Sequence, residues 1–296
     1  MESLAIKYRP KRFEDVVGQD VTIKILTNQI NNNSYSHAIL FSGNAGCGKT
    51  TCARIFANMI DGEILELDCA SHNGVSEIKE IVDMARVKPL IHEYKVIILD
   101  ECHTLTPQAW ASLLIVLEEN LSSTIFLFCT TDTQKIPNTI MSRVQRFNFL
   151  PISNKLIYNR LITICNSENI IISKESLIYI VKSANGSLRQ ALTNLDKCIS
   201  YGDLSIESVS KVLNLIMNEV FDTIYTAFEN HDRIIIINTI ESVYNNGYNL
   251  HQFVRQFLDY CTRKTSFNLL ERLLTILQDI RYDDSPKNII IARLII

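Results

Sequence analysis

The sequence predicts an α/β domain with a parallel sheet, followed by a region that contains only helices. Between residues 37 and 149, short apolar runs alternate with helix-like segments, which is typical of a parallel sheet covered by helices. Leu150-Pro151-Ile152-Ser153 interrupts this alternation, and no strand-like run follows it. Tyr201-Gly202-Asp203 supplies a second break. We therefore expect three domains, at residues 1–150, 151–203 and 204–296.

The periodicity also places the individual elements. We expect strands at residues 38–42, 64–68, 96–100 and 125–129, and helices near 50–60, 75–87 and 107–120. The second domain is expected to hold helices at 154–167, 174–184 and 187–200. Ser153 and Ser173 are candidate N-caps, because a serine hydroxyl can accept from the free N–H groups of a first helical turn. Helices are expected in the last domain at about 206–215, 218–229, 232–245, 249–264, 266–281 and 286–295.

Composition limits the function classes. The 296 residues are 47% hydrophobic, enough for a substantial core, and the net charge of −3 gives no overall attraction to nucleic acid. No apolar run approaches the roughly 20 residues that cross a bilayer, and the N-terminal residues lack the core of a signal peptide. We therefore expect a cytoplasmic protein without membrane contact. The eight cysteines are scattered, so reduced, buried thiols are expected rather than disulfides.

A glycine-rich segment carries the strongest chemical signal. Residues 43–50 fit the phosphate-binding pattern G-x-x-x-x-G-K-[ST], after an expected strand and before an expected helix. In such a loop, backbone N–H groups surround the phosphates, Lys49 meets the outer phosphate charge, and Thr50 reaches Mg²⁺. The alternative is an ordinary glycine turn. The candidate ATP-binding residues of this segment are Gly43, Asn44, Ala45, Gly46, Cys47, Gly48, Lys49, Thr50 and Thr51.

Two later strands end in polar residues. Asp100 and Glu101 follow the apolar run 96–99, as expected for a buried strand that delivers carboxylates to the edge of a sheet. Asp100 is expected to hold Mg²⁺, and Glu101 to orient the attacking water. The alternative is a strand that ends in a solvated acidic turn. Thr131 follows the next strand and is a candidate sensor of the outer phosphate or the water, although a threonine pair commonly ends a strand.

The chain resembles the clamp-loader group of AAA+ ATPases, specifically the gamma/tau (DnaX) family of bacterial DNA polymerase III subunits. The resemblance covers residues 4 to about 200. It rests on the phosphate loop and on five further motifs in family order, at residues 7–19 (KYRPKRFEDVVGQ), 67–75 (LDCASHNGV), 130–137 (TTDTQKIP), 142–147 (SRVQRF) and 186–192 (GSLRQAL). It implies a P-loop AAA+ domain, a small helical lid and an all-α collar that holds subunits in a ring-like assembly.

The resemblance also implies roles for single residues. Arg143 resembles the arginine finger that reaches the ATP site of a neighbouring subunit, where a guanidinium offsets transition-state charge. Arg189 resembles the sensor-2 arginine of the lid, which contacts the phosphates of its own subunit. Arg9, Pro10 and Val17 would line the adenine side. Without the motifs, either arginine would be read as a surface charge.

The chain departs from the family pattern in three ways. No C-x-x-C pair is present where the family carries a four-cysteine zinc module, so zinc is not expected; Cys69 and His72 have ligand-like spacing but no second pair nearby. Val144 replaces the family's cysteine after Arg143. The sequence ends after one helical region, and the family's long tau tail is not expected. The two losses, of the zinc module and of the tail, bring the chain closer to the compact loader subunits of phages, archaea and eukaryotes, and they suggest a phage-encoded or reduced-genome origin.

The implied partners are a sliding clamp, primer–template DNA and other loader subunits, in a pentamer of identical or different chains. Lys79, Arg86 and Lys88 are candidate DNA contacts, although basic residues on a helix commonly form a solvated face. Phe253, Phe257 and Leu258 could pack against neighbouring subunits, but packing within their own chain is the simpler expectation.

Two other functions stay open at this stage. One is a motor that translocates on nucleic acid, with residues 100–103 (DECH) as its helicase box; against it, the chain lacks a second motor domain and a helicase arginine motif. A branch-migration motor of the AAA+ group would need a winged-helix domain at 204–296. The other is a nucleotide-binding scaffold that hydrolyses nothing, which the intact Lys49, Asp100, Glu101 and Arg143 argue against.

Overall fold

The computed structural model describes residues 2–119, 121–264, 267–283 and 286–295. The chain forms two compact units. The first comprises residues 1–169 and 184–193, and the second comprises residues 170–183 and 194–296. No helix in the described part of the chain is both long enough and apolar enough to cross a membrane.

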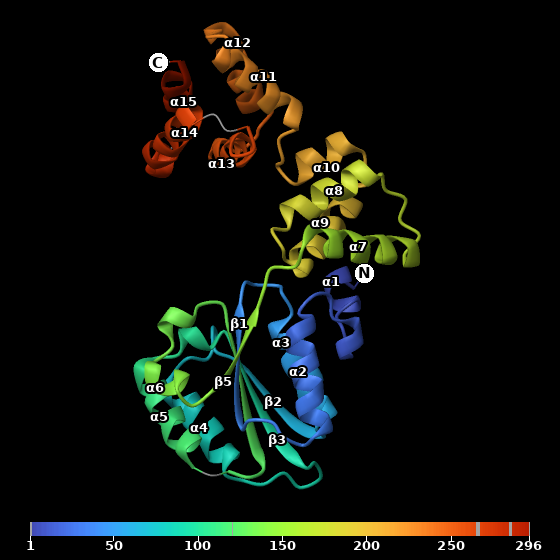
Figure 1. Ribbon diagram of the computed structural model, residues 1–296, viewed down its shortest axis with the longest axis vertical. Helices are drawn as coiled ribbons and strands as arrows, with labels where there is room; N and C mark the ends of the chain where they lie inside the picture. The colour runs from blue at the N-terminus through green and yellow to red at the C-terminus, as the bar shows by residue number, and fades with distance from the viewer. Residues whose placement is uncertain (1, 120, 265–266, 284–285, 296) are drawn as a thin grey trace. The chain divides into compact units, whose positions relative to one another are not determined.

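A five-stranded parallel sheet forms the centre of the first unit (Figure 1). Its strand order is β2-β3-β4-β1-β5, and all four neighbouring pairs are parallel. The carboxyl ends of all five strands therefore lie at one edge, where Asp68 pairs in register with Asp100, and Ser42 with Thr130. The strands are β1 (Ala38–Gly43), β2 (Gly62–Asp68), β3 (Tyr94–Asp100), β4 (Thr124–Thr130) and β5 (Gln145–Phe149).

Helices cover both faces of this sheet. Because side chains alternate along a strand, Leu40 of β1 packs into the core with α4 and α5, and Phe41 packs into the core with α2 and α3. Figure 1 shows the two helical layers on opposite sides of the strands. The helices of this unit are α1 (Leu4–Lys7), α2 (Asp20–Asn31), α3 (Lys49–Met59), α4 (Val75–Ala85), α5 (Pro107–Glu118), α6 (Asn138–Met141) and α7 (Asn154–Ser167).

The predicted strands and helices of the first domain are present, but the sequence pattern does not predict strand β5 or helices α1, α2 and α6. Strand β5 pairs with β1, but its sequence QRFNF contains only two apolar residues, so the alternation is too short to recognise. Phe147 and Phe149 are nevertheless buried and complete the core beside Phe41. Helix α2 has only Thr22 and Leu26 buried, which gives a weak amphipathic pattern.

Both predicted serine caps are confirmed. The Ser153 hydroxyl accepts from the N–H of Leu156 at the start of α7, and the Ser173 hydroxyl accepts from the N–H of Ser176 at 3.1 Å. Helix α8 (Lys174–Ser183) belongs to the second unit, and α9 (Leu188–Tyr201) belongs to the first unit up to residue 193. The three-domain division stays a prediction.

Of the remaining helices of the second unit, α11 to α15 share one apolar core, and α10 packs against α8. Phe221 of α11 stacks on Phe257 of α13 with 5.4 Å between ring centroids, and Phe253 and Phe257 are fully buried within their own chain. Leu258 packs on the edge of this core. Most bounds lie close to the predicted ones, but α10 and α13 each end three residues early. These helices are α10 (Ile206–Val212), α11 (Asn218–Glu229), α12 (Arg233–Asn245), α13 (Leu250–Cys261), α14 (Phe267–Asp279) and α15 (Pro286–Ile295).

Candidate nucleotide-binding site

The phosphate loop connects β1 to α3 and depends on glycine at its first position. Gly43 has φ +141°, and a Cβ atom there would lie 2.2 Å from the carbonyl oxygen of Phe149. Only glycine fits this close approach of two backbones. Lys49 begins α3 and is 5% exposed; its Nζ donates to the carbonyl oxygens of Gly43 at 2.8 Å and Asn44 at 2.9 Å. The ammonium therefore lies over the loop that would hold the phosphates.

Thr50 and Asp100 meet across the gap between α3 and β3. The Thr50 hydroxyl donates to Asp100 Oδ2 at 2.8 Å, and Thr50 is buried in the first turn of its helix. A hydroxyl oxygen and a carboxylate oxygen are the ligand types that Mg²⁺ prefers. The two predicted metal-binding residues therefore lie together and fit a magnesium ion by donor type.

Glu101 is held in a tight turn after β3. Its φ of +47° and ψ of +41° lie in the left-handed region, which costs a non-glycine residue about 1 kcal/mol or more. Its N–H donates to Asp100 Oδ1 at 3.0 Å, and its carbonyl accepts from the Thr104 hydroxyl at 2.9 Å. The same hydroxyl donates to the carbonyl of Cys69 at 2.6 Å, so the turn is tied to the end of β2.

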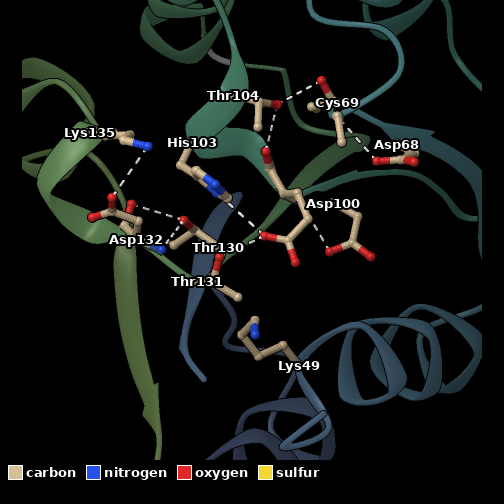
Figure 2. A network of polar contacts seen from close by, with 12 residues as sticks. Lys49, Asp68, Cys69, Asp100, His103, Thr104, Thr130, Thr131, Asp132 and Lys135 are labelled. Atoms are coloured by element: carbon tan, nitrogen blue, oxygen red, sulfur yellow. Dashed lines mark hydrogen bonds and ion pairs between the residues drawn. The ribbon is translucent and has the colours of Figure 1, made fainter. Parts of the chain in front are cut away.

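The Glu101 carboxylate contacts the neighbouring strand. Thr131, which follows β4, donates its hydroxyl proton to Glu101 Oε2 at 3.0 Å. His103 Nδ1 lies 3.3 Å from the same oxygen, but without hydrogen-bond geometry, and the described residues supply no hydrogen-bond partner for it. Figure 2 shows Lys49, Asp100 and Thr131 on adjacent elements around the same space. The sequence prediction missed His103 as a neighbour of Glu101, although the DECH segment contains it.

A cavity of about 330 Å³ opens beside the loop, within the first unit. The predicted adenine-side residues Arg9, Pro10 and Val17 line it, together with Arg189 from α9. The Arg9 Nε donates to the Thr51 hydroxyl at 3.2 Å. Other lining residues include Ala45 to Thr51, Asp100, Glu101 and, unpredicted, Tyr8, Val16, Ile152 and Leu192. Tyr8 and Val16 lie within the motif at 7–19 and Leu192 ends the motif at 186–192, whereas Ile152 lies outside every motif.

The cavity is electrostatically suited to an anion. Burial lowers the pKa of Arg9, and the nearby guanidinium groups of Arg54 and Arg189 lower it further. Positive charges that destabilise one another gain most from a negatively charged ligand. The charge of the cavity therefore favours an anionic ligand such as a phosphate chain.

Arg143 does not line this cavity. It lies after α6, exposed, where its Nη2 donates to Glu118 Oε1 at 2.5 Å and its Nη1 donates to the Thr139 carbonyl at 2.8 Å. The structure thus brings Lys49, Asp100, Glu101 and Thr131 together and leaves Arg143 outside their site.

Comparisons with known proteins agree with this geometry. Residues 39–152 match the family model described as ATPase family associated with various cellular activities (AAA), and residues 156–204 match DNA polymerase III clamp loader subunit, ATPase lid domain. Over 277 residues the chain is 36% identical to DNA polymerase III subunit gamma/tau of Mycoplasma genitalium, covering 84% of this chain and 46% of that protein. The chain belongs to the gamma/tau family of DNA polymerase III subunits.

A second relative extends the match. The chain is 32% identical over 304 residues to DNA polymerase III subunit tau of Bacillus subtilis, covering 94% of this chain and 54% of that protein. It thus spans about half the length of these gamma/tau relatives. Among solved structures, the Thermotoga maritima RuvB Holliday junction branch migration motor has a TM-score of 0.59 over 75% of this chain and 80% of that chain. The sequence identity is 17%, so this likeness concerns the fold alone.

Two expectations about this gamma/tau chain are refined by the structure. Arg86 binds Glu119 through Nη2 at 2.6 Å and Nε at 3.0 Å, so this predicted DNA contact already has an anionic partner. Lys79 and Lys88 are exposed, and the described residues supply no ion-pair partner for either.

The cysteines of the gamma/tau chain are all buried and unpaired. Burial raises the pKa of the Cys69 thiol to about 12, so it is neutral at physiological pH and packs in the core as a small apolar side chain. The described residues contain no group of three or more His, Cys, Asp or Glu side chains placed to hold a metal. The zinc expectation stays a prediction.

Proposed function

We propose that this chain is an ATPase subunit of a DNA sliding-clamp loader. The observation that carries the proposal is a set of P-loop site residues that lie together in a gamma/tau family member: Lys49, the Thr50–Asp100 pair and the Thr131–Glu101 pair border one space. Binding of ATP would order the assembly so that it opens the clamp and grips primed DNA. Hydrolysis would then release both.

The chemistry would follow from positioning and charge. Lys49 exchanges the loop carbonyls for the outer phosphates of ATP, and Thr50 and Asp100 hold Mg²⁺, which supplies charge neutralisation when it is bound. Glu101 accepts a hydrogen bond from the attacking water and polarises it. Thr131 keeps the Glu101 carboxylate at the edge of the sheet. The contacts of Lys49, Thr50, Asp100, Glu101 and Thr131 support these roles.

Arginines of this subunit would contact the bound nucleotide, and an arginine of the neighbouring subunit would complete the catalytic site. Arg189 contacts the phosphates of its own subunit from the lid helix, and Arg9, Pro10 and Val17 form the adenine side. Arg143 acts in trans, because its guanidinium is exposed and does not line its own cavity. Hydrolysis thereby depends on the neighbouring subunit, which couples ATP turnover to assembly.

The partners would be the sliding clamp, primer–template DNA and other loader subunits in the cytoplasm. Lys79 and Lys88 supply phosphate contacts, and Arg86 joins them only if it leaves Glu119. The domain at 1–150 hydrolyses ATP, the lid at 151–203 responds to it, and the collar at 204–296 holds the ring. The described collar elements are all helices, which fits a collar better than the winged-helix domain of a branch-migration motor.

Stimulated ATP hydrolysis tests this function. The assembled complex should hydrolyse ATP faster when both clamp and primed DNA are added, and Arg143→Ala should remove most of that activity. A motor would hydrolyse without any clamp, and a scaffold would not hydrolyse at all. Unchanged hydrolysis by the assembled Arg143→Ala complex would refute the role in trans.

A further inference from the structure

Two neighbouring acids end helix α5, and each binds one arginine. Glu118 binds Arg143 with 2.5 Å between Oε1 and Nη2, and Glu119 binds Arg86 with 2.6 Å between Oε1 and Nη2. Acidic residues at a helix C-terminus are unfavourable, because the helix dipole already places negative charge there. Glu118 is the last residue of α5, and its last turn contains no basic residue. The sequence therefore keeps a carboxylate where helix stability alone would disfavour it.

The pair contributes little to stability. The side chains of Arg143 and Glu118 are 37% and 53% exposed, and ion pairs at such sites contribute little to folding. The ion pair instead restricts the conformation of the Arg143 side chain. An arginine side chain has many rotamers, and fixing them before a reaction lowers the entropy cost of reaching the productive arrangement.

The contacts fix the guanidinium but do not saturate it. Nη1 donates to the Thr139 carbonyl at 2.8 Å and to the Ser142 hydroxyl at 3.3 Å, while Nη2 donates to Glu118. Within the described residues, Nε has no partner. Because a guanidinium has five N–H donors, an oriented and exposed group keeps donors for an external phosphate.

We propose that Glu118 is the positioning residue of the Arg143 finger. It holds the guanidinium in a fixed orientation on the subunit surface, ready for the ATP site of the next subunit. This inference rests on the proposed function, in which Arg143 acts in trans. Glu118 itself touches neither nucleotide nor the reacting atoms.

A donor–acceptor mixture tests the proposal. Acceptor subunits carry Arg143→Ala and keep their phosphate loop; donor subunits carry Lys49→Ala and keep their finger. Neither hydrolyses ATP alone, and mixing them creates sites with an acceptor loop and a donor finger. Adding Glu118→Gln to the donor should lower the kcat of the mixture roughly tenfold with little change in KM. The same substitution in the acceptor should leave kcat unchanged.

Matched variants separate positioning from general damage. Glu119→Gln in the donor removes the adjacent ion pair of the same kind and should leave kcat unchanged at saturating primed DNA. Glu118→Asp keeps the charge and should restore part of the loss. Equal effects of Glu118→Gln in donor and acceptor, or no effect in the donor, would overturn the proposal. No activity in the mixture with Glu118 intact would instead refute the trans site itself.

Discussion

The Thr131 hydroxyl donates a 3.0 Å hydrogen bond to Glu101 Oε2 and so connects the ends of strands β4 and β3 through two side chains. The parallel register of the sheet brings these ends together, because β3 and β4 are neighbours and finish at the same edge. The carboxylate proposed to polarise water is therefore oriented by a residue from a different strand.

Removing this hydroxyl should slow hydrolysis without weakening ATP binding. We predict that Thr131→Val lowers kcat by about 10- to 100-fold, since a hydrogen bond to a charged group contributes roughly 1.5–3 kcal/mol. The dissociation constant of a fluorescent ATP analogue should stay within about twofold. Thr163→Val, which removes a hydroxyl that only contacts its own helix, is the control. A weaker affinity with normal kcat would show that Thr131 acts on binding instead.

The proposed Mg²⁺ ligand Asp100 can be tested against Asp68, the acid that pairs with it on the neighbouring strand. We predict that Asp100→Asn lowers kcat by at least about 100-fold and raises the Mg²⁺ concentration needed for half-maximal activity, because a carboxylate ligand is lost. Asp68→Asn alters the acid that pairs with Asp100 across the ladder, where it caps Ala70 and Ser71, and should keep a normal Mg²⁺ requirement. An unchanged Mg²⁺ titration for Asp100→Asn would exclude it as a metal ligand.

Much of this site follows from local sequence, and the remainder depends on long-range packing. The phosphate loop, Asp100 and Glu101 were predictable because each follows an apolar strand directly, and parallel strands end at one edge. The Ser153 and Ser173 caps were predictable because capping is local. Strand β5 was not predictable, because three of its five residues, Gln145, Arg146 and Asn148, are polar and leave too short an alternation to recognise. The Glu118–Arg143 pair joins residues 25 apart, and nothing local indicates it.

Substitution of Gly43 in the phosphate loop should destabilise the fold for a steric reason. We predict that Gly43→Ala lowers the free energy of unfolding of the first unit by about 3 kcal/mol, because its Cβ would collide with the Phe149 carbonyl and its φ is positive. Urea unfolding followed by the fluorescence of buried Trp110 measures this. Gly74→Ala, whose Cβ would meet only the mobile end of Glu77, should cost less than about 1 kcal/mol. Equal losses in both variants would contradict the collision.

Acid stability should depend on Glu168. Hydrogen bonds from Lys7 Nζ and the Tyr8 hydroxyl hold the pKa of this carboxyl below its ordinary value of 4.5. A lowered pKa in the folded state stabilises the fold above pH 4.5, and this contribution is lost as the pH falls through the folded pKa. Glu168→Gln should therefore be less stable at neutral pH, with a shallower loss of stability on acidification. Parallel pH profiles for the two proteins would exclude this linkage.

Transfer of a clamp to DNA tests the proposed function most directly. Labelled clamp, circular primed DNA and ATP are mixed with the assembled complex, and the clamp that co-elutes with DNA is measured. Wild-type complex should leave clamp on the DNA only when ATP is present, and complex built with Lys49→Ala should leave almost none. Clamp transfer that is equal with and without ATP, or unaffected by Lys49→Ala, would contradict an ATP-driven loader.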